Sequence, residues 1–309
     1  MKYNLKLRNL GVKKMFDRIF TSYLVDKGKL TEDNVDHIFS AKEKRRARLG
    51  VIAVAEKVMT AEQADEVNEL QAIYDKRFGD IAVDRGYLTE EQVSRLLDLQ
   101  GNNFLAFVQS AVDLKLLTMD EINESLDDFQ KEHSLTIGDM ESLKSCDLDL
   151  VVPVLLYKQD PLLIEISSVM LRTINRLVDF QFYMKKPYIT KELSYDAISM
   201  QELFGDHSLL NAFTGSKEAL KQTAIGFAGA EQIENEEDVL DALCELTNCI
   251  NGLFASNLSA KNIEVDMKPP YYSNTSGCLK GDSLLCIPLV VFNQPITVTF
   301  TLDSDFTNN

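Results

Sequence analysis

The apolar positions in the first half of the chain recur with a fixed period. Threonine recurs every 29 residues, at Thr31, Thr60, Thr89 and Thr118. An apolar residue stands directly before each threonine, and another stands eleven residues before it. These eight residues are Leu30, Met59, Leu88, Leu117, Phe20, Leu49, Phe78 and Phe107. Strict spacing of this kind is typical of stacked repeats, so we expect residues 15–132 to form a helical stack that buries these side chains.

Each threonine also predicts the start of a helix. Gln63, Gln92 and Glu121 stand three residues after the last three threonines, which is the spacing of a capping box. Apolar residues then recur at helical spacing, so each repeat is predicted as a short helix, a turn and a longer helix. Most helical repeats of this type are scaffolds for protein contacts.

The period stops after residue 133, and the pattern changes. We therefore predict a helical repeat domain over 1–135 and a second domain over 136–309, with fragments 1–135 and 150–309 folding separately. The second domain is predicted to contain helices over 162–180 and near 217–227, strands over 182–189, 197–203 and 208–214, and a C-terminal hairpin around Asn293. The fold class is α+β, with a mainly antiparallel sheet in the second domain.

One further helix, beginning after Asn235, contains residues that are poor helix formers. Its apolar stripe is predicted as Val239, Leu243, Leu246, Ile250 and Leu253, with Asp241, Glu245 and Asn248 exposed on the opposite side. Asn248, Asn251 and Gly252 each lower helix stability relative to alanine, and we expect them on a face that packing does not require. Local preferences that are broken together often mark function.

At these residues the sequence resembles the CheC and CheX family. The family signature is Asp or Ser, three residues, Glu, two residues, Asn, and a proline some twenty residues later. This chain has Asp241, Glu245 and Asn248, followed by Pro269 or Pro270. The resemblance covers residues 160–305 and includes Gly252 and the strand that follows the helix.

The resemblance implies dephosphorylation of the aspartyl phosphate of a CheY-like response regulator. In this picture Asn248 orients the attacking water and Glu245 engages the partner's lysine, while Asp241, Gly252 and Pro269 have supporting roles. The chain would need no cofactor or metal of its own, because the phosphorylated receiver domain holds its own magnesium.

A second copy of the signature, as CheC-type proteins carry, would comprise Ser168, Arg172, Asn175 and Pro187. Arg172 stands where the family has glutamate, and its positive charge would repel a lysine. We interpret this copy as inactive and its helix as retained for packing. One active helix per chain resembles CheX, whose members often dimerise, so a homodimer is an open alternative.

The two middle repeats share a motif that the outer repeats lack. Both begin with Arg, an apolar residue and Gly, and both end in Gln; the residues are Arg48, Gly50, Gln71, Arg77, Gly79 and Gln100. Here the sequence resembles the N-terminal domain of the GspE and MshE secretion and pilus ATPases, in which tandem motifs can bind cyclic di-GMP. Lys57 replaces the mid-motif glycine that Gly86 preserves. The alternative is that the glycines permit close helix packing and the arginines are solvated.

Charge and composition exclude several classes of function. A net charge of -16 lacks the basic footprint that binding a nucleic acid polymer requires. The five cysteines form no Cys-x-x-Cys pair and the three histidines show no metal-ligand spacing, so we expect free thiols and no metal site. The sequence has no apolar stretch of about 18 residues, and we expect a cytoplasmic protein without membrane insertion.

Two functional hypotheses remain. The first is a response-regulator phosphatase whose helical repeats form a sensory or docking module. The alternative is a non-catalytic adaptor that binds a receiver domain or pilus and secretion machinery. A conventional hydrolase with a serine or cysteine nucleophile has no supporting motif.

Overall fold

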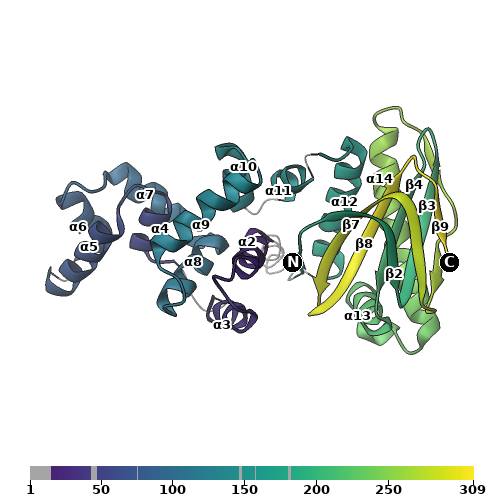
Figure 1. Cartoon of the computed structure of the whole chain (residues 1–309), viewed down its shortest axis with the longest axis horizontal. Helices are drawn as coiled ribbons and strands as arrows, with labels where there is room; N and C mark the ends of the chain where they lie inside the picture. Colours follow the sequence, from purple (N-terminus) through teal and green to yellow (C-terminus); the bar gives the residue numbers. More distant parts are fainter. Residues whose placement is uncertain (1–14, 43–46, 75, 146–147, 157, 180–181) are drawn as a thin grey trace. The chain divides into compact units, whose positions relative to one another are not determined.

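The computed structural model describes residues 15–42, 47–74, 76–145, 148–156, 158–179 and 182–309. Contacts between Cα atoms divide the chain into one compact unit, Phe16–Ser145, and a second that contains Cys146–Asn309. The described residues of the first unit form helices, whereas those of the second form helices and an antiparallel sheet (Figure 1). The α+β prediction is confirmed. The division between the units falls after Ser145, inside the predicted second domain, and separate folding of 1–135 and 150–309 stays a prediction.

The first unit is a succession of short and longer helices. Their bounds are α2 (Met15–Asp26), α3 (Glu32–Lys42), α4 (Leu49–Ala55), α5 (Ala61–Tyr74), α6 (Phe78–Asp84), α7 (Glu90–Asp98), α8 (Asn103–Asp113), α9 (Met119–Glu132) and α10 (Ile137–Ser145). Helices α3, α5, α7 and α9 each begin directly after one of the four regularly spaced threonines. All eight apolar residues predicted to be buried are buried.

The four threonines cap these helices in the same way. In each case the backbone N–H of the third residue after the threonine donates to the threonine hydroxyl over 3.2 Å. The side chain of that third residue accepts in return from the threonine backbone N–H, over 2.7–3.1 Å. Asn34 therefore closes the same reciprocal pair after Thr31 that the longer Gln and Glu side chains close in the other repeats.

A left-handed residue precedes each of these threonines by three positions. Gly28, Lys57, Gly86 and Lys115 have φ values of 70°, 57°, 72° and 56°. Glycine adopts this conformation without strain, and lysine does so at a cost. Glycine and lysine alternate at this position, and both adopt the positive φ that the turn requires. A glycine here is therefore explained by the backbone without a ligand.

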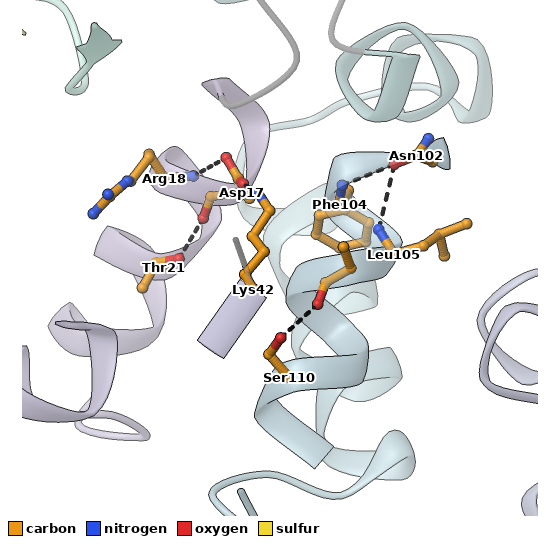
Figure 2. Close-up of polar contacts among 9 residues, drawn as sticks. Asp17, Arg18, Thr21, Lys42, Asn102, Phe104, Leu105 and Ser110 are labelled. Atoms are coloured by element: carbon orange, nitrogen blue, oxygen red, sulfur yellow. Dashed lines mark hydrogen bonds and ion pairs between the residues drawn. The ribbon is translucent and has the colours of Figure 1, made fainter. Parts of the chain in front are cut away.

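A buried charged pair joins α2 to α3. The ammonium group of Lys42 contacts the Asp17 carboxylate, and their side chains are 5% and 0% exposed. Figure 2 shows that the Asp17 carboxylate also accepts from the backbone N–H of Arg18, over 2.9 Å, and that the Thr21 hydroxyl donates to the Asp17 carbonyl. The ion pair connects the two helices directly. Replacing one of its members would leave an uncompensated buried charge, which is strongly destabilising.

The second unit combines helices with a sheet. The helices are α11 (Leu148–Leu155), α12 (Pro161–Leu177), α13 (Lys217–Ala228) and α14 (Glu236–Ser259). The strands are β1 (Tyr183–Met184), β2 (Tyr188–Tyr195), β3 (Ala197–Gly205), β4 (Leu209–Gly215), β5 (Val265–Met267), β6 (Tyr271–Ser273), β7 (Gly277–Val291), β8 (Gln294–Leu302) and β9 (Phe306–Asn308). The path β1-β7-β8-β4-β3-β5 is antiparallel throughout; β2 and β9 pair with β7, and β6 pairs with β3.

The structure differs from the predicted elements in two places, and it contains the predicted C-terminal hairpin. The strand predicted over 182–189 is instead the two-residue β1 followed by β2. The residues between 133 and α12, for which the sequence predicts no element, contain α10 and α11. Helix α11 has Pro153 inside it, and a short helix interrupted by proline has little periodic signal. The final hairpin turns on Phe292 and Asn293, both with positive φ as a tight two-residue hairpin turn requires.

Strands β3 and β4 carry polar side chains on the face that packs against α14. Gln201 and Asn211 are direct partners across the two strands, so their side chains share a face. The opposite face is apolar, where Ile198, Leu210 and Ala212 belong to a buried cluster with residues of β7. The sheet thus presents buried amides to a single helix, α14, which is flanked by α12 and α13.

Candidate functional site

Helix α14 begins as the sequence predicts. The Asn235 side chain accepts hydrogen bonds from the backbone N–H groups of Glu237 and Asp238, over 2.7 and 3.1 Å, and the Asp238 carboxylate accepts one from the Asn235 N–H over 3.0 Å. The predicted apolar stripe is buried except for Leu253, which is 40% exposed. Phe254 takes its place, because the stripe continues at four-residue steps from Ile250.

The signature residues share one side of α14. Asp241, Glu245, Asn248 and Gly252 follow at steps of four, three and four residues, which places them on the outer face of the helix. Asp241 and Glu245 are exposed, and Glu245 forms no ion pair with any side chain that the structure describes. A Cβ atom added to Gly252 would meet only the Met267 methyl group, at 3.9 Å. The outer face therefore has free negative charge and open space.

Asn251 does not lie on that face, contrary to our prediction. Its side chain is fully buried between α14 and the sheet. Its Nδ2 donates to Oε1 of Gln201 over 2.9 Å, and its Oδ1 accepts from Nδ2 of Asn211 over 2.9 Å. Buried amides require hydrogen-bond partners, and these two bonds to β3 and β4 offset the poor helix propensity of Asn251.

Asn248 is half-buried and joins the same row of amides. Its Oδ1 accepts from Nε2 of Gln201 over 3.1 Å, and the same Nε2 donates to the Lys268 carbonyl over 2.9 Å. No described residue accepts a hydrogen bond from Asn248 Nδ2. The expectation that Asn248 is simply exposed was therefore wrong, because half of its amide is engaged by β3 while the other half is free.

Pro269 is exposed and directly follows the carbonyl that Gln201 contacts. A proline confines the residue before it to extended backbone conformations. Gln201 itself was missed by the sequence analysis. The sequence shows that Ser199 and Gln201 share one face of the predicted strand over 197–203, but the burial of that face follows only from the structure.

The thiols on α14 are poorly suited to nucleophilic chemistry. Burial raises the pKa of the Cys244 thiol, which lowers the fraction of the reactive thiolate. Cys244, Cys249, Cys278 and Cys286 are all free, and Cys146 lies outside the described residues. Within the described part of the chain, no cluster of three or more His, Cys, Asp or Glu residues could hold a metal ion.

The second copy of the signature lies on α12 and has a different environment. Arg172 forms an ion pair with Asp149 of α11. Ser168 is buried and its hydroxyl donates to the Ile164 carbonyl over 2.9 Å, while the buried Oδ1 of Asn175 has no partner among the described residues. These contacts tie the side chains of Ser168 and Arg172 to the unit itself.

In the helical unit, the glycines of the tandem motif lie against neighbouring side chains and its glutamines form hydrogen bonds to the backbone. A Cβ on Gly50 would lie 2.9 Å from the Phe78 ring, and one on Gly79 would lie 2.8 Å from a Val93 methyl group. The side chain of Gln71 donates to the Lys76 carbonyl and that of Gln100 to the Ala47 carbonyl, each directly before one of the motif arginines. Arg48 and Arg77 are exposed. The glycines and glutamines therefore have structural explanations, whereas both arginine side chains are exposed and the Arg48 guanidinium lies 4.0 Å from the Asp113 carboxylate.

A family model matches part of the second unit. Residues 197–299 match the model described as chemotaxis phosphatase CheX. These residues form a CheX domain. The match includes β3, β4 and the whole of α14, so the outer face and the row of amides both belong to the CheX domain.

Solved structures similar to this chain cover less than half of it. A chemotaxis protein from Desulfovibrio vulgaris Hildenborough is 18% identical with a TM-score of 0.41, over 46% of this chain and 97% of its own. CheX from Desulfovibrio desulfuricans is 19% identical with a TM-score of 0.39, over 45% and 99%. A chain in the CheX-CheY-BeF3-Mg²⁺ complex from Borrelia burgdorferi is 21% identical with a TM-score of 0.34, over 46% and 95%.

No curated protein matches the chain. Among the described helices, none is both long enough and apolar enough to cross a membrane.

Proposed function

We propose that the CheX domain hydrolyses the aspartyl phosphate of a CheY-like response regulator. The family match supports this function, and the observation that carries it is the outer face of α14. There the amide nitrogen of Asn248 lies one turn from the carboxylate of Glu245, and neither group has a partner among the residues that the structure describes. In the reaction a water oxygen attacks phosphorus and the bond to the aspartate oxygen breaks, giving inorganic phosphate and a free aspartate.

Asn248 has the chemistry that this reaction needs. Its Nδ2 donates to a phosphoryl oxygen, and the second lone pair of its Oδ1 accepts a hydrogen bond from the attacking water. Positioning a water molecule in line with the leaving oxygen supplies most of the acceleration, because phosphoryl transfer requires little covalent participation from the protein. Magnesium in the receiver domain offsets the charge of the phosphoryl group.

Glu245 has the role of a docking contact. Its carboxylate is exposed and forms no ion pair with the described side chains, so it is free to contact a lysine of the receiver. Asp241, one turn earlier, adds negative charge to the same surface. Gly252 leaves room for the partner beside Asn248, since a side chain there would point into open space.

For the helical unit we propose a docking module, with cyclic di-GMP as a ligand that the exposed Arg48 and Arg77 would contact. Arginine can stack on a guanine base or bind a phosphate through two hydrogen bonds. Calorimetric titration of the full chain with cyclic di-GMP tests this, with Arg48→Ala and Arg77→Ala as controls. Absence of binding heat at high micromolar cyclic di-GMP would exclude the nucleotide as a ligand and leave protein docking as the proposed role of the helical unit.

The phosphatase proposal is tested by the decay of phosphorylated receiver domains. Each receiver domain from the same cell is phosphorylated in the presence of magnesium. The decay of the phosphorylated receiver is then followed with the wild-type full chain, with the Asn248→Ala variant and without either protein. We expect acceleration by wild type only. If wild type binds a receiver without accelerating decay, the non-catalytic adaptor is the correct function.

A further inference from the structure

We infer that Gln201 is a positioning residue for Asn248, and that it acts by fixing which end of the Asn248 amide faces the partner. This inference rests on the proposed phosphatase function. Gln201 lies on β3, outside the signature, and is 2% exposed. It therefore cannot touch a receiver domain, and any effect on the reaction must pass through Asn248.

The orientation of the Gln201 amide is fixed by a backbone carbonyl. Its Nε2 has two hydrogens, and these are donated to the Lys268 carbonyl over 2.9 Å and to Oδ1 of Asn248 over 3.1 Å. If the amide were reversed, its oxygen would face the Lys268 carbonyl oxygen and no hydrogen bond could form. A backbone carbonyl cannot exchange donor and acceptor roles, so the amide nitrogen must point toward Lys268.

The Lys268 carbonyl is itself held in place. The backbone N–H of Lys268 donates to the Glu202 carbonyl over 2.9 Å, and its side chain pairs with Glu202 at 2.6 Å. Pro269 restricts the Lys268 backbone further. The signature proline thus has a structural connection to the signature asparagine, through Lys268 and Gln201.

The rest of the row follows the same direction. Oε1 of Gln201 accepts from Asn251, and Asn251 accepts from Asn211. The amides therefore run head to tail from Asn211 to Asn248, an arrangement in which each hydrogen bond polarises the next. The row ends with Oδ1 of Asn248 held against β3 and with Nδ2 turned away from it.

This arrangement favours a donor at the outer face. Rotation of the Asn248 amide by half a turn would direct its oxygen toward phosphoryl oxygens and its nitrogen toward Nε2 of Gln201, which is also a donor. Both contacts would be repulsive. Gln201 therefore selects the one amide orientation that can bind phosphate.

The test replaces Gln201 by methionine in the full chain, which keeps the length of the side chain and removes its amide. For a phosphorylated receiver we expect kcat to fall roughly 10- to 100-fold with KM unchanged within twofold. In an Asn248→Ala background, Gln201→Met should lower kcat no further. Asn211→Ala is the matched control, because it disturbs the same buried row without contacting Asn248 and should preserve kcat.

A second measurement does not depend on activity. The ¹H–¹⁵N heteronuclear NOE of the Asn248 side-chain amide, assigned by its loss in Asn248→Ala, should show a rigid group in wild type and a mobile one in Gln201→Met. Pro269→Ala is a second variant for the case in which Gln201→Met does not fold, because it alters only an exposed residue. It should lower both the NOE of the Asn248 amide and kcat.

The outcomes separate the two proposals. An unchanged kcat in Gln201→Met, or an equal further loss in the Asn248→Ala background, would overturn the positioning role. A wild-type protein that accelerates no receiver would overturn the proposed function, and an unchanged NOE in the variants would then also overturn the claim that Gln201 holds Asn248.

Discussion

Asn248 and Asn251 contact the same glutamine of β3 with opposite polarity: Asn248 accepts a hydrogen bond from Gln201, and Asn251 donates one to it. The two asparagines are one helical turn apart and are equally poor helix formers. One of them is half-buried with a free amide nitrogen, whereas the other is fully buried with both ends of its amide bonded. With the proposed function, this difference assigns Asn248 to the reaction and Asn251 to the stability of the fold.

Asn251→Ala should destabilise the protein, and Asn248→Ala should not. Removing the Asn251 amide leaves Asn211 Nδ2 and Gln201 Oε1 buried without partners, which costs about 1–3 kcal/mol. Asn248→Ala should leave the free energy of unfolding near that of wild type and abolish most receiver dephosphorylation. Urea unfolding and phosphate release, measured on both variants, give the comparison. Equal stability losses would contradict it.

Glu245→Ala should weaken complex formation more than turnover. Loss of an exposed charged contact should raise KM roughly severalfold and reduce the salt dependence of KM, with a smaller change in kcat. Arg172→Ala, on α12, is a charge-changing control and should leave both constants unchanged, because Arg172 pairs with Asp149 within the same unit. A salt dependence identical to wild type in Glu245→Ala would exclude the proposed contact.

Gly252→Ala should stabilise the free protein and impair receiver binding. Alanine in a helix is favoured over glycine by about 0.5–1 kcal/mol, and the new methyl group would meet only Met267. Gly226→Ala on α13 is the matched control, since its methyl group would overlap the Phe292 ring and should destabilise the protein. Thermal unfolding and receiver titration distinguish the two. Tighter receiver binding by Gly252→Ala would refute a clearance role.

Acidification should weaken the cap of α9 but not that of α7. Hydrogen bonds from the Thr118 backbone and side chain lower the pKa of Glu121 below 4.5. Glu121 therefore contributes stability above the unfolded pKa, and this contribution is lost as pH falls through the lower folded value. Glu121→Gln should reproduce the amide cap of Gln92 and remove this part of the pH dependence. Chemical unfolding from pH 7 to 2 checks whether the two proteins converge at low pH.

The regular features of the fold could be predicted from the sequence. Thr89 with Gln92 and Thr118 with Glu121 mark helix starts because the caps depend on residues three positions apart. Asn235 and the apolar spacing likewise predicted α14, and the signature on it identified the CheX domain.

The position of each polar group relative to the sheet could not be predicted in the same way. Asn248 and Asn251 look alike in sequence. Only the packing of α14 on β3 and β4 buries Asn251 against both Gln201 and Asn211, whereas Asn248 contacts Gln201 alone of these two. The contact between α14 and β3 is non-local, because Gln201 lies 47 residues from Asn248 in the sequence. The sequence could not decide whether Gly50 and Gly79 serve a ligand or helix packing for the same reason. Phe78 and Val93 come close to them only after the helices pack.

The amides facing α14 also bear on how the sheet assembles. A slip of β3 by one residue would turn Gln201 into the apolar cluster around Leu279 and Cys286, and would bring Met200 beneath the asparagines. A misaligned hairpin would therefore leave several buried amides unsatisfied at once. The residues that orient Asn248 thereby penalise alternative strand alignments during folding.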